Sequence, residues 1–492
     1  MRRVVVVGAG LGGLSAACHL AGAGYDVTVV ERGAVPGGRA GTLELDRYRF
    51  DTGPTVLTMP ELFERCFRAV DVEMSELLTV RAIDPIYRAC FADGTQINVR
   101  RGREAMAQEI REVGGASEEQ SFHRFAAWLT ELYAREMEPF IARNYDSPLD
   151  LVRPLSPALA ILRHGAFRRL GPTVARYFSD DRLQRLFSFQ ALYAGLAPHR
   201  ALALYAVITY MDTIGGVVVT DGGVQALPRA LAEAARRGGA EIRYGSDVER
   251  IVTAAHDGGP VTGVRLTDGD FVPGDFVVCN ADMPDAYARL LPHLVPPRPV
   301  RRGRYSPSAV VWHVGARGAL PDGAAHHNIH FGRTWKSAFR TLLDDGRRMR
   351  DPSLLVSAPS IDDPTLSPPG AHSLYVLEPV PNLSSGIDWS KERPRVRDDL
   401  REALVRFGYP SEIDVEALVD PTDWQRQGLA KGTPFSLAHT FLQTGPFRPS
   451  NVERRAPGLV FVGSCTVPGV GVPMVVVSGE LAARRVIAME HA

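Results

Sequence analysis

Short apolar runs alternate with glycine-rich segments at the start of the chain. Four consecutive valines at 4–7 form a β-branched run that is typical of a buried parallel strand. A glycine-rich loop follows at 8–13, then a helical pattern at 14–20 and a second strand pattern at 26–30. This order predicts the strand–loop–helix–strand unit of a Rossmann-type α/β fold.

The loop carries the spacing Gly-x-Gly-x-x-Gly, and each glycine has a physical role. Gly8 permits a tight turn, Gly10 lets the backbone approach a pyrophosphate, and Gly13 lets the helix pack closely on the strand. The start of the helix offers free N–H groups to the phosphates. Glu31, at the end of the second strand, can accept hydrogen bonds from ribose hydroxyls and would repel a 2′-phosphate. The unit therefore predicts NAD or FAD rather than NADP.

Apolar patterns predict further elements later in the chain. A helix is expected at 226–237, with Gly238 and Gly239 at its end, followed by strands at 240–243, 247–251 and 276–279. A buried strand at 459–462 precedes a glycine-rich segment and an apolar helix near the C-terminus. Amides at the start of that helix can stabilise negative charge on a reduced flavin.

Composition and charge narrow the class of protein. A chain of 492 residues predicts two or three domains, and its equal counts of 56 basic and 56 acidic residues give no general attraction to nucleic acid. The five scattered cysteines include no Cys-x-x-Cys pair, so we expect neither a disulfide framework nor a zinc site, and a reducing, cytoplasmic compartment fits. The N-terminal arginines and apolar run superficially resemble a signal peptide, but glycines interrupt the run. We expect no membrane-spanning helix.

A second glycine-rich segment separates FAD from NAD. Residues 36–40 read Pro-Gly-Gly-Arg-Ala, and residues 51–54 read Asp-Thr-Gly-Pro. Here the chain resembles the flavin-dependent amine oxidase and carotenoid desaturase superfamily, in which these two segments line the flavin. The resemblance implies FAD as the cofactor. The residues that we expect to bind it are Gly8, Gly10, Gly13, Glu31, Arg32, Gly38, Arg39, Gly53, Pro54, Val248, Gly463 and Val472.

The C-terminal half carries the most specific motifs. Residues 463–474 (GSCTVPGVGVPM), 435–443 (FSLAHTFLQ) and 447–449 (FRP) are similar to the bacterial phytoene desaturases, which are FAD-dependent carotenoid desaturases, as is Phe-Ser-Phe at 187–189. The resemblance runs nearly end to end. One departure is Val219-Thr220, where the family usually has an aromatic residue and a proline.

The resemblance also implies a division into domains. A Rossmann-type FAD-binding domain is expected from three discontinuous segments, 1–80, 222–284 and 456–492. A mixed-sheet substrate domain is expected from 81–140 and 285–455. A helical, membrane-associating subdomain is expected at 141–221.

The resemblance implies removal of a hydride and a proton across a C–C single bond of a long polyene, with phytoene converted stepwise towards lycopene or neurosporene. Such a substrate needs a long apolar tunnel. Only one dinucleotide fingerprint is present, so oxygen and a quinone both remain open as the acceptor that reoxidises the flavin. His439, Arg448 and Asp51 are the candidate polar groups near the flavin; a packed core histidine and a loop-holding arginine are the alternatives. The histidines at 326, 327 and 330 are expected in a surface loop rather than at a metal site.

The segment 151–179 predicts contact with a membrane. It has no acidic residue, and its five arginines and His164 alternate with apolar side chains. A basic, apolar helical segment suits the anionic inner face of the cell membrane. The alternative is an ordinary helical subdomain with a solvated basic face.

Other functions of the same fold stay open. A carotenoid isomerase or another polyene oxidoreductase would share these motifs. An amine oxidase usually needs an aromatic cage, and residues 465–468 offer none. A non-catalytic isoprenoid-binding protein would tend to lose the flavin motifs, which are intact here. The sequence decides neither the oligomeric state nor a forty- against a thirty-carbon substrate.

Overall fold

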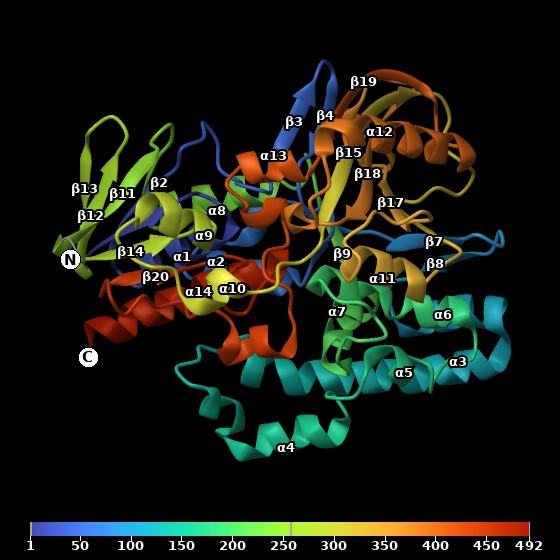
Figure 1. The fold of residues 1–492 in the computed structure, drawn as a ribbon, viewed down its shortest axis with the longest axis horizontal. Helices are drawn as coiled ribbons and strands as arrows, with labels where there is room; N and C mark the ends of the chain where they lie inside the picture. The colour runs from blue at the N-terminus through green and yellow to red at the C-terminus, as the bar shows by residue number, and fades with distance from the viewer. Residues whose placement is uncertain (1, 256–257, 492) are drawn as a thin grey trace.

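The computed structural model describes residues 2–255 and 258–491 (Figure 1). A five-stranded parallel sheet has the order β10-β2-β1-β14-β20. Its strands are β1 Arg3–Val7, β2 Asp26–Val30, β10 Glu241–Arg243, β14 Phe276–Cys279 and β20 Leu459–Phe461. They come from three separated stretches of the chain. The predicted Rossmann-type fold assembled from discontinuous segments is thus confirmed.

Small residues let the helices pack tightly on this sheet. The main helices are α1 Leu11–Gly22, α2 Pro60–Arg68, α8 Ala226–Arg237 and α14 Val472–Glu490. The Ser15 hydroxyl of α1 donates a hydrogen bond to the Val476 carbonyl of α14, at 2.7 Å. A side chain at Gly479 would overlap the carbonyl oxygen of Gly12, so the close approach of the two helices requires glycine at position 479. On the other face lies an antiparallel sheet of β11 Val248–Ala255, β12 Gly258–Leu266 and β13 Phe271–Pro273.

A seven-stranded mixed sheet forms a second body, at the upper right of Figure 1. Its order is β19-β15-β18-β17-β16-β7-β8, and β16 pairs with β7 in parallel while the other pairs are antiparallel. The strands are β7 Tyr87–Phe91, β8 Gln96–Val99, β15 Ser308–Arg317, β16 His327–Phe331, β17 Leu354–Ser357, β18 Ala371–Val380 and β19 Glu412–Val419. The helix α12 Trp389–Arg406 packs on it around the fully buried Trp312.

A group of helices lies below the seven-stranded sheet in Figure 1. It contains α3 Arg103–Glu136, α4 Leu155–His164, α5 Leu170–Val174, α6 Asp181–Leu186 and α7 Ala206–Thr209. The long α3 is broken at Gly115, whose φ is +80°. Aromatic residues such as Phe125 and Phe187 fill a core that continues into β7 and β16. The helices of 141–221 therefore share their core with α3.

The remaining elements connect these bodies. They are the hairpin of β3 Thr42–Leu45 and β4 Tyr48–Asp51, the sheet of β5 Leu57–Thr58, β9 Val217–Thr220 and β6 Val80–Ala82, and the helices α9 Met283–Asp285, α10 Arg298–Arg302, α11 Lys336–Leu343 and α13 Pro421–Arg426. Across the described residues, the helices are all too short or too polar to cross a membrane.

The expectation of a surface loop for three histidines was wrong. His327 and His330 lie on β16, and both are buried, as is His326 just before the strand. His326 pairs with Asp362 at 2.7 Å, His327 contacts the Ser357 hydroxyl at 2.7 Å, and His330 stacks on Phe407. The sequence pattern did not reveal the strand, because it is buried on both faces and therefore lacks the alternation of apolar and polar residues.

Candidate functional site

A cavity of about 1170 Å³ runs between the parallel sheet, the mixed sheet and the helical group. One end is lined by the loop after β1 and by Glu31, at the carboxyl edge of the parallel sheet. The other end is lined by α4 and by Phe167. The carboxyl edge is where Rossmann-type folds hold dinucleotides.

Backbone shape at the dinucleotide end depends on glycine. Gly8 has a φ of +96°, which favours glycine. A β-carbon on Gly10 would lie 2.6 Å from the amide nitrogen of Asn280. One on Gly13 would overlap the Gly8 carbonyl oxygen, so Gly13 serves close helix–strand packing behind the cavity wall, as its position in the motif predicts. Gly8 and Gly10 line the cavity.

Glu31 is held at the end of β2 by backbone amides. Its two carboxylate oxygens accept hydrogen bonds from the N–H groups of Ala9 and Gly33, each at 2.7 Å. Each oxygen keeps a second lone pair, so the carboxylate is fixed in place and can still accept a ribose hydroxyl. Arg32 also lines the cavity, and its guanidinium donates to the Gln427 carbonyl at 3.3 Å.

The second glycine-rich segment lies opposite the first. Gly37 donates its N–H to the Ala9 carbonyl at 3.0 Å, and Gly38 lines the cavity with a φ of +57°. Arg39 lines the cavity too and donates to the Ser464 hydroxyl at 2.9 Å and to the Pro434 carbonyl. Both glycines and the arginine therefore face the space between the two loops.

The other expected cofactor residues divide into two sets. Gly53, Pro54, Val248 and Val472 line the cavity. Gly463 lies one layer behind the wall, where its N–H donates to the Ser478 hydroxyl at 2.8 Å. The structure thus gives Gly463 a role in joining β20 to α14 rather than in the cavity lining.

These groups fit a dinucleotide. The cradle combines two glycine turns that leave no room for side chains, the start of α1, a fixed carboxylate and an arginine. Such a set supplies amide donors and positive charge to a pyrophosphate and an acceptor to a ribose.

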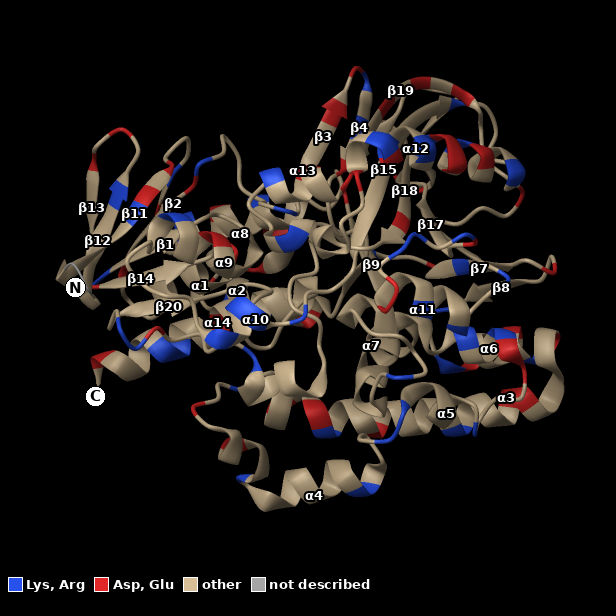
Figure 2. Ribbon diagram, viewed as in Figure 1, with Lys and Arg blue, Asp and Glu red and all other residues tan. Residues whose placement is uncertain are grey.

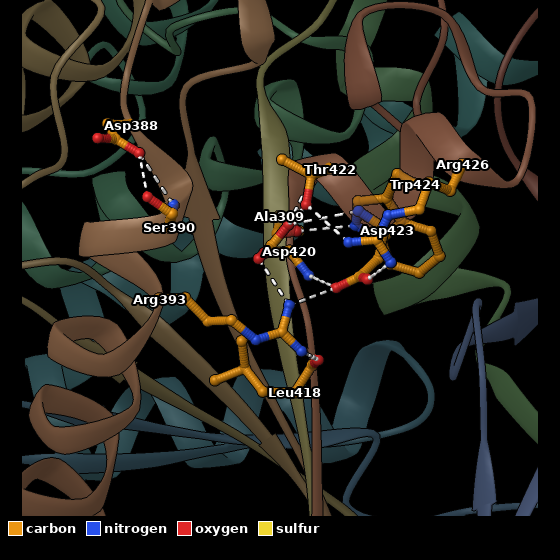
Figure 3. Close-up of polar contacts among 10 residues, drawn as sticks. All are labelled: Ala309, Asp388, Ser390, Arg393, Leu418, Asp420, Thr422, Asp423, Trp424 and Arg426. Carbon is orange, nitrogen blue, oxygen red and sulfur yellow. Dashed lines mark hydrogen bonds and ion pairs between the residues drawn. The ribbon is translucent and has the colours of Figure 1, made fainter.

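The middle of the cavity is apolar and braced from outside. Trp424 of α13 lines it, and the indole N–H donates to the Ala309 carbonyl at 2.9 Å (Figure 3). The guanidinium of Arg393 contacts Asp420 and Asp423, each at 2.6 Å, and so ties α12 to the start of α13. This network holds the wall rather than facing the cavity.

The outer end of the cavity opens through an apolar rim. We give this name to Leu149, Val152, Leu155, Leu159, Leu162, Phe167, Phe441 and Leu442, which are between 39% and 71% exposed. All except Leu149 and Leu442 also line the cavity. The ring centroids of Phe167 and Phe441 lie 6.0 Å apart, so the segment just after α4 contacts the 441–447 segment.

Not all apolar side chains of 151–179 belong to the rim. Ile161, Leu170, Val174 and Phe178 are buried in the core of the helical group. The five arginines of this segment are exposed. In Figure 2 the ribbon of α4 has blue near its ends and no red. The segment therefore joins the ordinary core on one side to a basic, apolar surface on the other.

Among the catalytic candidates, His439 faces the cavity. Its ring nitrogen Nε2 accepts the Val470 N–H at 3.3 Å. Burial, assisted by the nearby charge of Arg448, lowers the pKa of His439 well below its ordinary value. The imidazole is therefore neutral, and its other nitrogen carries the proton.

Arg448 lies behind the cavity wall, contrary to its expected place beside the flavin. Its guanidinium donates to four backbone carbonyls, those of Leu437, Gln443, Ser464 and Thr466. Burial lowers the pKa of Arg448 to about 10, so it stays charged at neutral pH. Arg448 fastens the 437–443 segment to the loop before α14, through carbonyls rather than a salt bridge.

Asp51 also lies outside the main cavity. It lines a separate pocket of about 20 Å³ together with His326 and Asp362, and its carboxylate accepts the Val224 N–H at 2.8 Å. Burial raises the pKa of Asp51 to about 6. The strand β4 turns Asp51 towards the 220–224 turn, while Gly53 and Pro54 continue into the cavity.

Two buried carboxyls in the cavity lining escaped the sequence analysis. Glu136 ends α3, and Asp212 lies on a turn of π-helix at Tyr210–Ile214. Glu136 follows Leu129 and Leu132 at the spacing i, i+3, i+7, which places it on the buried face of α3. That spacing is the sequence feature from which the burial of Glu136 could have been predicted. Neither residue belongs to a motif.

Comparison with known proteins defines the class of protein to which this chain belongs. The fold and the cradle are those of flavoprotein oxidoreductases that bind FAD. The family described as "Flavin containing amine oxidoreductase" matches residues 11–487, and the chain belongs to this family. FAD is therefore its cofactor, as expected.

Relatives place the chain more narrowly within that family. It is 51% identical to a phytoene dehydrogenase of Streptomyces griseus, over 98% of this chain and 94% of the relative. It is 39% identical to a zeta-carotene-forming phytoene desaturase of Myxococcus xanthus, over 100% and 95%. The expected resemblance to bacterial carotenoid desaturases is confirmed.

Solved structures share the fold. An oxidoreductase from Methanosarcina mazei is 17% identical, with a TM-score of 0.63, over 99% of this chain and 100% of the other. Wild-type putrescine oxidase is 17% identical, with a TM-score of 0.59, over 99% of both chains.

Proposed function

We propose that this protein is a phytoene desaturase that converts its substrate towards more unsaturated carotenoids. The observation that carries the proposal is the continuous cavity, which begins at a dinucleotide cradle and ends at an exposed apolar rim. A long polyene needs such a passage, because it must lie beside the flavin while the rest of the chain stays out of water. The curated relatives named above support phytoene as the substrate.

When bound, FAD supplies the two-electron acceptor for a hydride that leaves an allylic C–H bond. The residues of this chain bind the cofactor and orient the substrate beside it. Glu31 would hold the ribose and Arg39 the pyrophosphate, since both line the cavity at the carboxyl edge of the sheet. Trp424, Tyr375 and Phe435 line the apolar middle of the cavity, where they hold a polyene flat and exclude water.

We also propose that the apolar rim lies against the membrane from which the substrate arrives. The rim places leucines and phenylalanines at the opening of the cavity. Exposed arginines at 153, 163, 168, 169 and 176 accompany it. Apolar side chains with a basic surround favour an anionic bilayer, and such a contact gives the enzyme a peripheral position at the inner face of the cell membrane.

The test is direct desaturation. FAD-loaded protein is incubated with phytoene in liposomes, with oxygen or a soluble quinone as the final acceptor, and the absorption spectrum is recorded. Structured visible bands support the proposal, and their positions count the double bonds formed. An unchanged spectrum with bound flavin would point to a carotenoid isomerase or another polyene substrate; chromatography of the isomers then separates these two.

A further inference from the structure

Glu136 is a buried carboxyl in a largely apolar wall. Its side chain ends α3, lines the cavity and is only 4% exposed. One oxygen, Oε1, is fully buried and has no hydrogen-bond partner among the described residues. An unpaired carboxyl in such a place lowers stability, because burial removes its hydration without replacement. A group of this kind points to a functional role.

Its position lies between the rim and the loop before α14. The residues after it, Phe140, Ile141 and Tyr145, line the cavity towards the rim. On the other side is Tyr205, whose hydroxyl donates to the carbonyl of His439. Burial raises the pKa of the Tyr205 phenol, and the nearby Glu136 adds a smaller contribution in the same direction. Glu136 therefore lines the cavity that joins the rim to the cradle.

Three other polar candidates already have partners: Asp212 and His439 line the cavity, and Arg448 lies behind its wall. Asp212 accepts hydrogen bonds from Thr213 at 2.9 Å and from Gln190 at 3.3 Å. His439 uses Nε2 to accept a backbone N–H. Arg448 donates to carbonyls behind the wall. Glu136 alone among these combines a place in the lining with a free acceptor oxygen.

We propose that Glu136 accepts the proton that leaves the substrate during desaturation. This inference rests on the proposed function. One carbon of the CH–CH unit loses hydrogen with its electron pair to the bound flavin. The neighbouring carbon loses a proton to the Glu136 carboxylate, and the electrons of that C–H bond form the new double bond. Oxygen or a quinone later takes the electrons from the flavin, and Glu136 releases its proton to solvent.

Burial alone raises the pKa of Glu136 well above its ordinary value. A raised pKa makes the carboxylate a stronger base, which suits the abstraction of a proton from carbon. It also lowers the fraction of Glu136 that is ionised at a given pH. The other titratable groups that line this cavity are Glu31, Arg32, Arg39, Tyr145, Tyr193, Tyr205, Asp212, Asp247, Asp282, Asp285, Arg289, Tyr375 and His439. The reaction should therefore accelerate as pH rises and more Glu136 becomes ionised.

The experiment compares Glu136→Gln with Glu118→Gln in FAD-loaded full-length protein. Glu118 is a matched control, because it lies on the same helix and is 5% exposed, but accepts hydrogen bonds from Ser179 and Asp180 away from the cavity. Phytoene in liposomes is mixed anaerobically with each protein, and bleaching of the flavin is timed across a range of pH. We expect Glu136→Gln to slow bleaching at least about 100-fold and to lose the rise with pH. Glu118→Gln should stay within about twofold of the wild type.

A second readout does not depend on activity. Infrared difference spectra between the wild type and Glu136→Gln should contain a protonated carboxyl band that disappears at high pH. Equal bleaching rates in the wild type and Glu136→Gln would overturn the assignment and leave the proposed function standing. If the wild type itself does not bleach, the proposed function falls and the assignment with it. If Glu136→Gln does not hold FAD, Glu136→Asp decides: a slowed rate that still rises with pH supports the role, and a pH-independent rate overturns it.

Discussion

Arg448 shows how a single buried cation can organise the segments around a cavity. It is 3% exposed, and it satisfies carbonyls at 437, 443, 464 and 466, which belong to two segments on either side of β20. A charged donor is well suited to this task because its hydrogen bonds are stronger than neutral ones.

We predict that Arg448→Met destabilises the protein more than it alters chemistry. The substitution leaves four buried carbonyls without their donor, at a cost of at least about 3 kcal/mol. Thermal unfolding with and without FAD measures the loss. Arg454→Met is the control, because Arg454 is exposed, and it should change stability by less than about 0.5 kcal/mol. A fully stable Arg448→Met protein without activity would instead indicate that Arg448 takes part in the reaction.

At the scale of elements, α4 has two faces with different tasks. Ile161 joins the core of the helical group, whereas Leu155 and Leu162 are 59% and 58% exposed at the mouth of the cavity. A lone amphipathic helix of this length is marginal in water, so the packed face fixes it and leaves the other free for a bilayer.

We predict that replacing Leu155, Leu159 and Leu162 together by serine weakens binding to anionic liposomes at least tenfold. The physical reason is the loss of apolar area from the surface that would enter the bilayer. Co-sedimentation measures the bound fraction. Val295→Ser with Val405→Ser is the control, since both valines are exposed on other elements. Equal binding of the two variants would argue against the rim as the membrane contact.

The arginines near the rim offer an independent check of the same contact. Reversing Arg163, Arg168 and Arg176 to glutamate should weaken binding to anionic liposomes and leave binding to neutral liposomes nearly unchanged, because attraction to the surface charge is worth about 1 kcal/mol per basic residue. Raising the salt concentration should reduce the difference. Unchanged binding to anionic liposomes would favour an ordinary solvated basic face.

At the scale of the whole molecule, the fold buries ionisable groups along the cavity, and Asp212 is 5% exposed. Burial raises the pKa of Asp212 to about 7, although the hydrogen bonds from Thr213 and Gln190 lower that pKa in part. The folded state therefore binds a proton at Asp212 that the unfolded chain releases at lower pH. The stability from this group is present in full below the ordinary pKa of aspartate and is lost as pH rises to about 7.

We predict that Asp212→Asn becomes progressively more stable than the wild type as pH rises from 4 to 7. Asparagine cannot ionise, so it avoids a cost of about 1.4 kcal/mol for each pH unit over this interval. Thermal midpoints of both proteins at several pH values give the difference, which cancels the titration of other groups. A difference that stays constant with pH would show that Asp212 is not held protonated by the fold.

Local sequence patterns predicted much of the part of the molecule that forms the dinucleotide cradle. The glycines, Glu31 and the strands around them are close in sequence, and each follows from turn geometry or strand periodicity. The expected boundaries at 226–237 and 276–279 match α8 and β14. The positions of the candidate polar groups were predicted less well. Only His439 reached the cavity, while Asp51 and Arg448 lie outside it.

The sequence by itself determined the cofactor cradle and the family, because both rest on short motifs whose backbone geometry is local. Only the tertiary structure decided which side of a loop faces the substrate. It turned Asp51 and Arg448 away, buried the histidines of β16 and brought Glu136 to the cavity from a helix that no motif singled out. The reason is physical: burial and facing depend on segments hundreds of residues apart, which the pattern along one stretch of chain does not record.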